Sequence, residues 1–197
     1  IRKEKKVVEN TELTPLSLYN KTKMIAERTI MSYKDKLKIH CIRPATVCGY
    51  SEKMRLDLTV NVLTFNALKN KKIIVHGGKQ IRPNINIKDL VNVFYFFVKN
   101  MKLREGYYNA GFENMSVLDI AKKVKKSIPS KIIIKNIIDK RNYYLDSSKL
   151  LKAGFKRKYS IQDAIQELKK NYLNKKLKEN INFYSIKKLK KLKISWL

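Results

Sequence analysis

The chain has 197 residues, of which 44% are hydrophobic and 31% are charged. Apolar residues recur in short blocks along most of its length, which excludes a disordered chain and fits one globular domain or the larger part of one. The longest apolar run, residues 91–98, is far too short to span a bilayer, so no membrane partner is expected.

The formal net charge of +29 raises the question of a polyanionic partner. Only eight of the 45 basic residues are Arg, and the Lys residues are spread through every segment. Planar guanidinium groups that bind phosphates in pairs are therefore scarce. We expect no specific nucleic-acid surface, although a basic nucleic-acid-binding module stays open as an alternative. A small anionic substrate would also suit this charge.

Cys41 and Cys48 flank an apolar stretch, and the sequence shows no signal-peptide pattern. We therefore expect free, buried thiols in a reducing compartment, the cytoplasm. The two histidines, His40 and His76, lack the spacing of paired metal ligands, so no zinc site is expected.

Turn and capping residues mark the expected elements. Thr14-Pro15 predicts a helix with Thr14 as the N-cap, running towards Tyr33. A buried strand is predicted next, over residues 37–42. The remaining expected elements are helices over 57–69, 88–100, 116–127, 147–152 and 160–172, and strands over 73–75, 106–109, 131–135 and 142–145. This alternation indicates an α/β fold with some parallel strand pairing.

Glycine is scarce, and its positions bear on phosphate binding. The six glycines show no Gly-x-Gly-x-x-Gly spacing, and the first 48 residues contain none. A strand-to-helix turn that holds a dinucleotide phosphate needs glycines for close backbone approach. The chain also begins with Ile. We therefore expect the carboxy-terminal portion of a longer protein, without a dinucleotide-binding start.

Tyr19 and Lys23 lie four residues apart, which places both side chains on one face of the first predicted helix. An ammonium group beside a phenol favours the phenolate, so the pair suits acid–base chemistry. Taken alone, a chance pair on a solvated helix face is the simpler interpretation.

Three motifs in order give this pair more meaning. They are Pro15, Ser17, Tyr19, Lys23 and Glu27; then Arg43-Pro44-Ala45-Thr46-Val47-Cys48-Gly49; then Arg82-Pro83-Asn84-Ile85-Asn86-Ile87-Lys88-Asp89. Over about residues 12–168 the chain resembles the extended short-chain dehydrogenase/reductase family, specifically its NAD-dependent nucleotide-sugar epimerases and dehydratases. Cys48 departs from this pattern, where the family often has Tyr, and so does Asn86, where it often has His.

The resemblance implies NAD as the cofactor and a nucleotide sugar as the substrate. It makes Tyr19 the catalytic acid/base, Lys23 a ligand of the nicotinamide ribose, and Pro44 a neighbour of the nicotinamide ring. Tyr19 would take a sugar hydroxyl proton while a hydride passes to NAD, which gives a keto-sugar. Returning the hydride to the other face is epimerisation, whereas losing water first is dehydration. The runs around Arg55 and Arg82 favour an epimerase.

The same resemblance assigns the sugar-nucleotide diphosphate to Asn61, Arg82 and Arg141, because guanidinium donors meet phosphate oxygens in pairs. Each of these could instead be an ordinary surface residue. Arg55 could be a further sugar contact, or Asp57 nearby could simply cap the next helix.

The fold implied is an incomplete Rossmann-type, doubly wound parallel sheet, with its last strands only, and a smaller α/β substrate-binding lobe. Residues of about 1–49 and 87–104 would form the Rossmann part, and about 50–86 and 105–173 the lobe. Residues 174–197 would be a basic tail. A homodimer is a further expectation, and little activity is expected from the chain alone. An inactive remnant of such an enzyme stays open.

Overall fold

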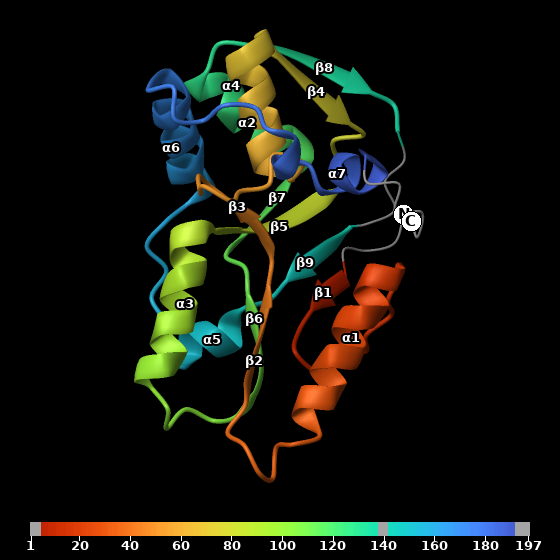
Figure 1. The fold of residues 1–197 in the computed structure, drawn as a ribbon, viewed down its shortest axis with the longest axis vertical. Helices are drawn as coiled ribbons and strands as arrows, with labels where there is room; N and C mark the ends of the chain where they lie inside the picture. Colours follow the sequence, from red (N-terminus) through yellow and green to blue (C-terminus); the bar gives the residue numbers. More distant parts are fainter. Residues whose placement is uncertain (1–4, 138–141, 192–197) are drawn as a thin grey trace.

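The computed structural model describes residues 5–137 and 142–191 (Figure 1). The strands are β1 (Lys5–Val7), β2 (His40–Pro44), β3 (Thr46–Cys48), β4 (Lys72–His76), β5 (Ile81–Asn86), β6 (Gly106–Ala110), β7 (Glu113–Ser116), β8 (Lys131–Lys135) and β9 (Tyr143–Leu145). The helices are α1 (Leu18–Met31), α2 (Thr59–Asn70), α3 (Ile87–Lys99), α4 (Val117–Ser127), α5 (Ser148–Lys152), α6 (Ile161–Leu173) and α7 (Ser185–Lys191), with a 3-10 turn at Ile181–Phe183. The expected α/β class is confirmed.

Strand pairing is mostly parallel. The pairs β1–β9, β2–β6, β3–β5 and β4–β8 are parallel, and β5–β7 is antiparallel. Within the described ranges these pairs form four small sheets, so the expectation of one doubly wound sheet holds only for the parallel pairing. Since β6 pairs with β2, residues 106–110 lie beside a strand of the predicted Rossmann part. The division into two parts stays a prediction.

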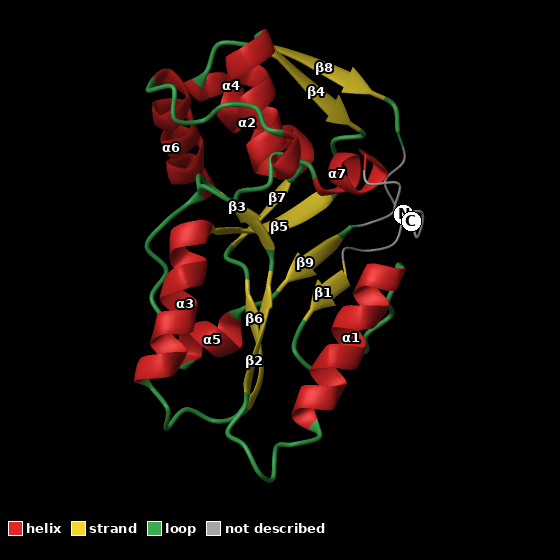
Figure 2. Cartoon of the chain, viewed as in Figure 1, coloured by secondary structure: helices red, strands yellow, loops and turns green. Residues whose placement is uncertain are grey.

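The three-stranded sheet β3–β5–β7 occupies the middle of the molecule (Figure 2). Above it in this view lie α2, α4 and α6 with the β4–β8 pair, and below it lies the β2–β6 pair, between α3 and α1. Among the described residues, no helix has the length and apolar character needed to cross a bilayer.

The first helix begins later than expected. Ser17, in extended backbone, is the N-cap, and its Oγ accepts a hydrogen bond from the backbone N–H of Asn20 at 3.2 Å. Thr14 as the N-cap was therefore wrong, and Pro15 lies before the cap instead of in the first helical turn. Both Thr and Ser are favoured caps, and the sequence offered two of them three residues apart.

The sequence-based prediction also omitted short strands. β5 was not expected because its sequence, Ile81-Arg82-Pro83-Asn84-Ile85-Asn86, contains Pro and Asn, which are depleted in strands. β2 begins at His40, three residues after the predicted start. Part of the expected basic tail packs against the rest of the protein. Leu177 is 3% exposed and belongs to a small apolar cluster with Leu56 and Phe65.

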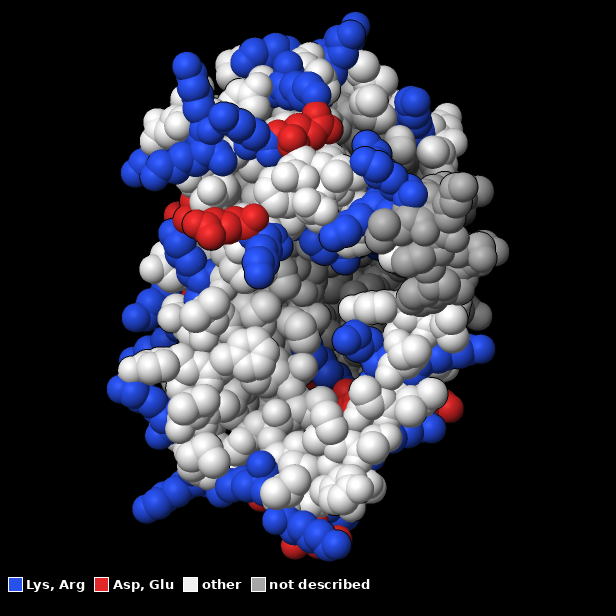
Figure 3. Space-filling model, in the orientation of Figure 1, with Lys and Arg blue, Asp and Glu red and all other residues white. Residues whose placement is uncertain are grey.

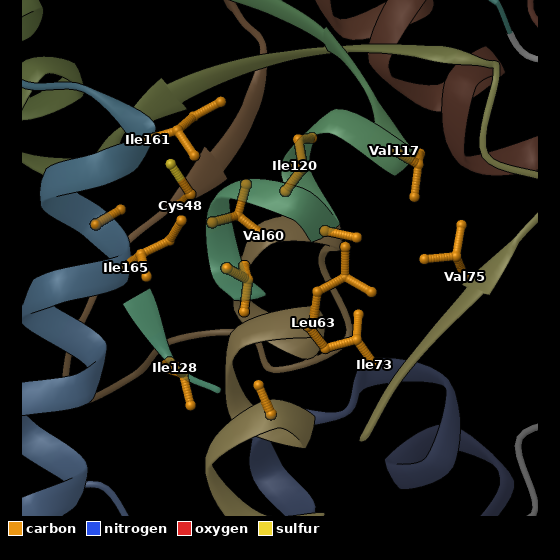
Figure 4. Packing of buried hydrophobic residues seen from close by; sticks show 14 of the residues in the cluster. Cys48, Val60, Leu63, Ile73, Val75, Val117, Ile120, Ile128, Ile161 and Ile165 are labelled. Carbon is orange, nitrogen blue, oxygen red and sulfur yellow. The ribbon is translucent and has the colours of Figure 1, made fainter. Parts of the chain in front are cut away.

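A dense apolar cluster fills the upper part of the molecule (Figure 4). Val60 and Leu63 of α2 meet Ile120 of α4 and Ile165 of α6, and each is at most 3% exposed. Burying one such side chain contributes about 1.5–3 kcal/mol. This cluster holds α2 firmly, and α2 in turn supports the loop between β3 and α2.

Asp89 links α3 to the segment just before α6. Asn86 caps α3, and Asp89, the third residue of that helix, is completely buried. Its carboxylate accepts hydrogen bonds from the backbone N–H groups of Lys158, at 3.0 Å, and Tyr159, at 3.0 Å, just before α6. The carboxylate therefore ties the start of α3 to the segment that leads into the upper helices.

We predict that Asp89→Ala lowers the free energy of unfolding by about 3 kcal/mol, because two backbone N–H groups lose a charged acceptor that is completely buried. Urea titration measures this change. Asp119→Ala is the matched control, since Asp119 is also the third residue of its helix, α4, but is exposed. It should cost under about 1 kcal/mol. Equal losses in the two variants would contradict the assigned role of Asp89.

Candidate active site

Tyr19 and Lys23 lie together near the start of α1. The Nζ atom of Lys23 is 5.5 Å from the centre of the Tyr19 ring. Tyr19 is 65% exposed, and Lys23 is also exposed. The predicted neighbourhood of the two side chains is therefore confirmed, and both remain accessible to a ligand.

The first turn of α1 faces the part of the molecule that carries α2 and α7 (Figure 1). Arg55, in the loop before α2, donates from Nε to Asp57 Oδ1 at 2.9 Å and from Nη2 to Asp57 Oδ2 at 3.0 Å. These bonds raise the pKa of Arg55 above its ordinary value, burial opposes the rise, and the charges of Asp57 and the Tyr19 phenol add to it. The Arg55 guanidinium thus lies within electrostatic reach of Tyr19.

The interpretation of Asp57 as the cap of the next helix was wrong, because Asp57 is not the N-cap of α2. The N-cap position belongs to Leu58, which makes no side-chain capping bond. Asp57 instead accepts from Arg55 and from the backbone N–H of Ser185, at 3.1 Å, where α7 begins. Its carboxylate therefore fixes the Arg55 side chain and one end of α7.

The side-chain amide of Asn61 makes hydrogen bonds to two backbone groups of the protein. It is 2% exposed, its Oδ1 accepts from the backbone N–H of Gly49 at 3.0 Å, and its Nδ2 donates to the carbonyl oxygen of Arg55 at 2.9 Å. Gly49 has a φ of 115°, which an L side chain rarely adopts. Asn61 thus holds the loop on which Arg55 stands.

Pro44 and Arg82, two of the predicted site residues, lie on neighbouring segments of the chain. Pro44 ends β2, and β3 begins two residues later with Thr46, which is opposite Asn84 of β5 in parallel register. Arg82 therefore lies near the junction of β2 and β3. Its side chain is 8% exposed, and its Nη1 donates to the carbonyl oxygen of Ile81 at 2.9 Å. Arg141 lies outside the described residues.

One ion pair attaches α1 to β2. Arg43 donates from Nε to Glu27 Oε2 at 2.7 Å and from Nη2 to Glu27 Oε1 at 2.6 Å, which is a bidentate arrangement. The sequence motif identifies Glu27 but not its partner. Its partner lies 16 residues away in sequence, and no local spacing rule would find it. Side chains of both signs are visible in the hollow beside α1 (Figure 3).

Both cysteines are free, as expected. Cys48 is 1% exposed, whereas Cys41 is only half-buried. Burial, assisted by Glu113, raises the pKa of Cys48 to about 12, and burial together with Glu27 raises the pKa of Cys41 to about 11. In the part of the chain that the structure describes, no group of three or more His, Cys, Asp or Glu side chains gathers as metal ligands would.

A pocket of about 430 Å³ lies elsewhere, between β9 and α5. Phe112, Leu145, Ser148 and Arg157 line it, together with Lys6, which is paired with Asp146 at 2.6 Å. Of the site residues implied by the sequence motifs that the structure describes, none lines this pocket.

The parallel strand pairs, the flanking helices and the Tyr–Lys pair at a helix start define an α/β protein of the Rossmann type. The family model described as "NAD dependent epimerase/dehydratase family" matches residues 2–111, more than half of the chain. The chain belongs to this family.

Curated relatives of two activities match the chain. A dTDP-D-glucose 4,6-dehydratase of Dictyostelium discoideum is 32% identical over 123 residues, which cover 59% of this chain and 27% of the relative. A UDP-glucose 4-epimerase of Lactobacillus helveticus is 26% identical over 148 residues, which cover 63% of this chain and 44% of the relative. The chain thus spans less than half the length of these relatives.

Solved structures share the fold. The dTDP-glucose 4,6-dehydratase of Bacillus anthracis, in complex with NAD, superposes with a TM-score of 0.74 at 19% identity, over 95% of this chain and 60% of that one. The UDP-glucuronic acid 4-epimerase of Bacillus cereus, in complex with UDP-glucuronic acid and NAD, gives 0.72 at 24% identity, over 86% and 58%. At these identities the likeness establishes the Rossmann-type fold over most of the chain.

The family match corrects one expectation. We expected a carboxy-terminal portion without the cofactor-binding start, because the early glycines are missing. The family region instead begins at residue 2 and ends at residue 111, in the amino-terminal part of this chain. Glycine spacing was therefore a poor guide to which region of the family is present.

We predict that Asn61→Ala lowers the free energy of unfolding by about 2–3 kcal/mol, because the Gly49 N–H loses its buried acceptor and the Arg55 carbonyl loses a donor. Thermal or urea unfolding measures the loss. Asn66→Ala, on the same helix, is the control and should change stability by less than about 0.5 kcal/mol. An Asn61→Ala variant as stable as the control would show that the amide does not hold this loop.

Proposed function

We propose that this protein interconverts nucleotide sugars in an NAD-dependent reaction, by epimerisation or dehydration through a keto-sugar. The observation that carries the proposal is the exposed Tyr19–Lys23 pair at the start of α1, in a chain of this family. Relatives of both activities match, so the proposal covers both.

Two residues, Lys23 and Pro44, are proposed to meet the nicotinamide end of NAD. Lys23 presents an exposed ammonium group with three donors, which suits the hydroxyls of a ribose. Pro44 lies exposed at the carboxyl end of β2, and ligands of parallel α/β sheets bind at such strand ends. When bound, NAD would accept a hydride from the sugar carbon.

Tyr19 performs the proton transfer in this proposal. Its phenol oxygen takes the proton of the sugar hydroxyl as the hydride leaves the same carbon, and it returns the proton when the keto-sugar is reduced. The Nζ atom of Lys23 lies over the Tyr19 ring, 5.5 Å from its centre, so the ammonium group stays beside the reacting phenol. The exposure of Tyr19 leaves room for the sugar beside it.

Arg82 and Arg141 are proposed to bind the diphosphate, with Arg55 nearer the sugar. Guanidinium forks suit this task because they meet phosphate oxygens in pairs. The proposal gives Asn61 an indirect part, since its amide holds the loop that carries Arg55. The strongly basic composition also favours an anionic substrate.

We predict that Tyr19→Phe lowers turnover about 10²- to 10⁴-fold, the usual contribution of a positioned acid/base, while substrate binding changes little. The assay uses the protein as its gene encodes it, with NAD and a panel that includes UDP-glucose and dTDP-glucose, and identifies products by NMR. Tyr33→Phe, just past the other end of α1, is the control and should keep full turnover. Full turnover in Tyr19→Phe would refute the catalytic assignment. Absence of turnover across the panel in the unsubstituted protein would count against the function itself.

A further inference from the structure

The helix that carries Tyr19 and Lys23 is attached to the protein by very little apolar packing. None of the side chains of α1 is fully buried, and Leu18, Ile25 and Ile30 are each more than half exposed. Hydrophobic burial usually sets the rotation of a surface helix. Here that constraint is weak, so another interaction has to orient the helix.

Glu27 supplies such an interaction. Among the side-chain hydrogen bonds of α1 in the described ranges, only those of Glu27 reach another element, and they go to Arg43 and Cys41 of β2. The Glu27 and Arg43 side chains are 13% and 19% exposed, so solvent screens this pair less than a surface ion pair. Two parallel bonds also fix the angle between the carboxylate and the guanidinium.

Arg43 is itself held from two further directions. Its guanidinium lies over the Tyr107 ring, 4.4 Å from the ring centre, and its Nη1 donates to the carbonyl oxygen of Glu9 at 2.8 Å. Tyr107 lies on β6, directly beside Cys41 in the parallel register. The fork that meets Glu27 is therefore fixed on the β2–β6 pair.

Helix geometry connects this contact to the candidate site. Residues four apart on an α-helix lie about 6 Å apart along the axis and nearly above one another. Tyr19, Lys23 and Glu27 therefore form one stripe on α1. A bidentate contact at Glu27 fixes both the rotation of that stripe and its position along the axis.

We propose that Glu27 and Arg43 are positioning residues, which orient Tyr19 and Lys23 by clamping α1 onto β2. The catalytic part of this inference rests on the proposed function of Tyr19, whereas the clamp itself does not. A purely charge-stabilising pair would tolerate any cation at position 43. A clamp needs the planar fork, which Lys cannot reproduce.

Cys41 provides a reporter of the clamp that requires no turnover. Its Sγ is 3.6 Å from Glu27 Oε2, and its thiol is half-buried beneath α1. Arg43→Lys keeps the charges around this thiol, so a faster reaction with Ellman's reagent in that variant reports movement of α1. Cys48, at 1% exposed, should stay slow in every variant and serves as the internal reference.

The test compares Arg43→Lys and Glu27→Gln with Glu179→Gln, which neutralises the partner of Lys69 away from α1. We expect the Cys41 thiol to react at least about tenfold faster in the first two variants and at the unsubstituted rate in the third. We also expect kcat to fall about tenfold or more in the first two, with KM within about twofold, since the clamp acts on the reacting groups. Circular dichroism verifies that each variant is folded.

An unchanged Cys41 rate in Arg43→Lys would overturn the clamp. A faster thiol reaction with full kcat would overturn the positioning role and leave the clamp intact. If Tyr19→Phe also keeps full turnover, it is the catalytic assignment of Tyr19 that fails, while the thiol measurement still decides the clamp.

Discussion

The Arg43 guanidinium makes the contact on which the candidate site depends. Its planar group meets Glu27 with two bonds, lies over Tyr107 and donates to the Glu9 carbonyl, so one side chain joins α1, β2, β6 and the segment after β1. Glu9 extends the connection, because its Oε1 accepts from the backbone N–H of Asn109 at 2.9 Å. Arg suits this position because its charge is permanent and its donors are planar, whereas a Lys would bind through a single point.

The loop that carries Arg55 is held by apolar packing and amide hydrogen bonds, and not by an ion pair. α2 lies on the apolar cluster of the upper helices, and Asn61 on that helix pins both Gly49 and the Arg55 carbonyl. Asp89 then joins α3 to the segment before α6. The loop that carries Arg55 is therefore supported by a packed core, while the helix that carries Tyr19 is supported by an ion pair. This difference makes α1 the part of the site whose orientation responds most to a single substitution.

Much of the fold could be predicted from the sequence, because helices α3, α4 and α6 have apolar periodicity and N-cap side chains that bond the first turn. Strand β5 could not, since its Pro and Asn residues argue against a strand and only its neighbours β3 and β7 make it one. The Tyr19–Lys23 pair follows from spacing on one helix. The roles of Asn61, Glu27 and Arg43 do not, because their partners are set by tertiary packing. The missing glycines suggested a carboxy-terminal portion, and the family match at residues 2–111 overturned that expectation.

We propose that the start of α1, the loop of Arg55 and the start of β5 form one nucleotide-sugar site. Amide NMR spectra of the isotope-labelled protein, titrated with UDP-glucose or dTDP-glucose in the presence of NAD, test it most directly. The account predicts saturable shifts of the amides of Tyr19, Arg55 and Arg82 with a common dissociation constant. Shifts confined to the pocket between β9 and α5, with α1 and the Arg55 loop unchanged, would contradict it.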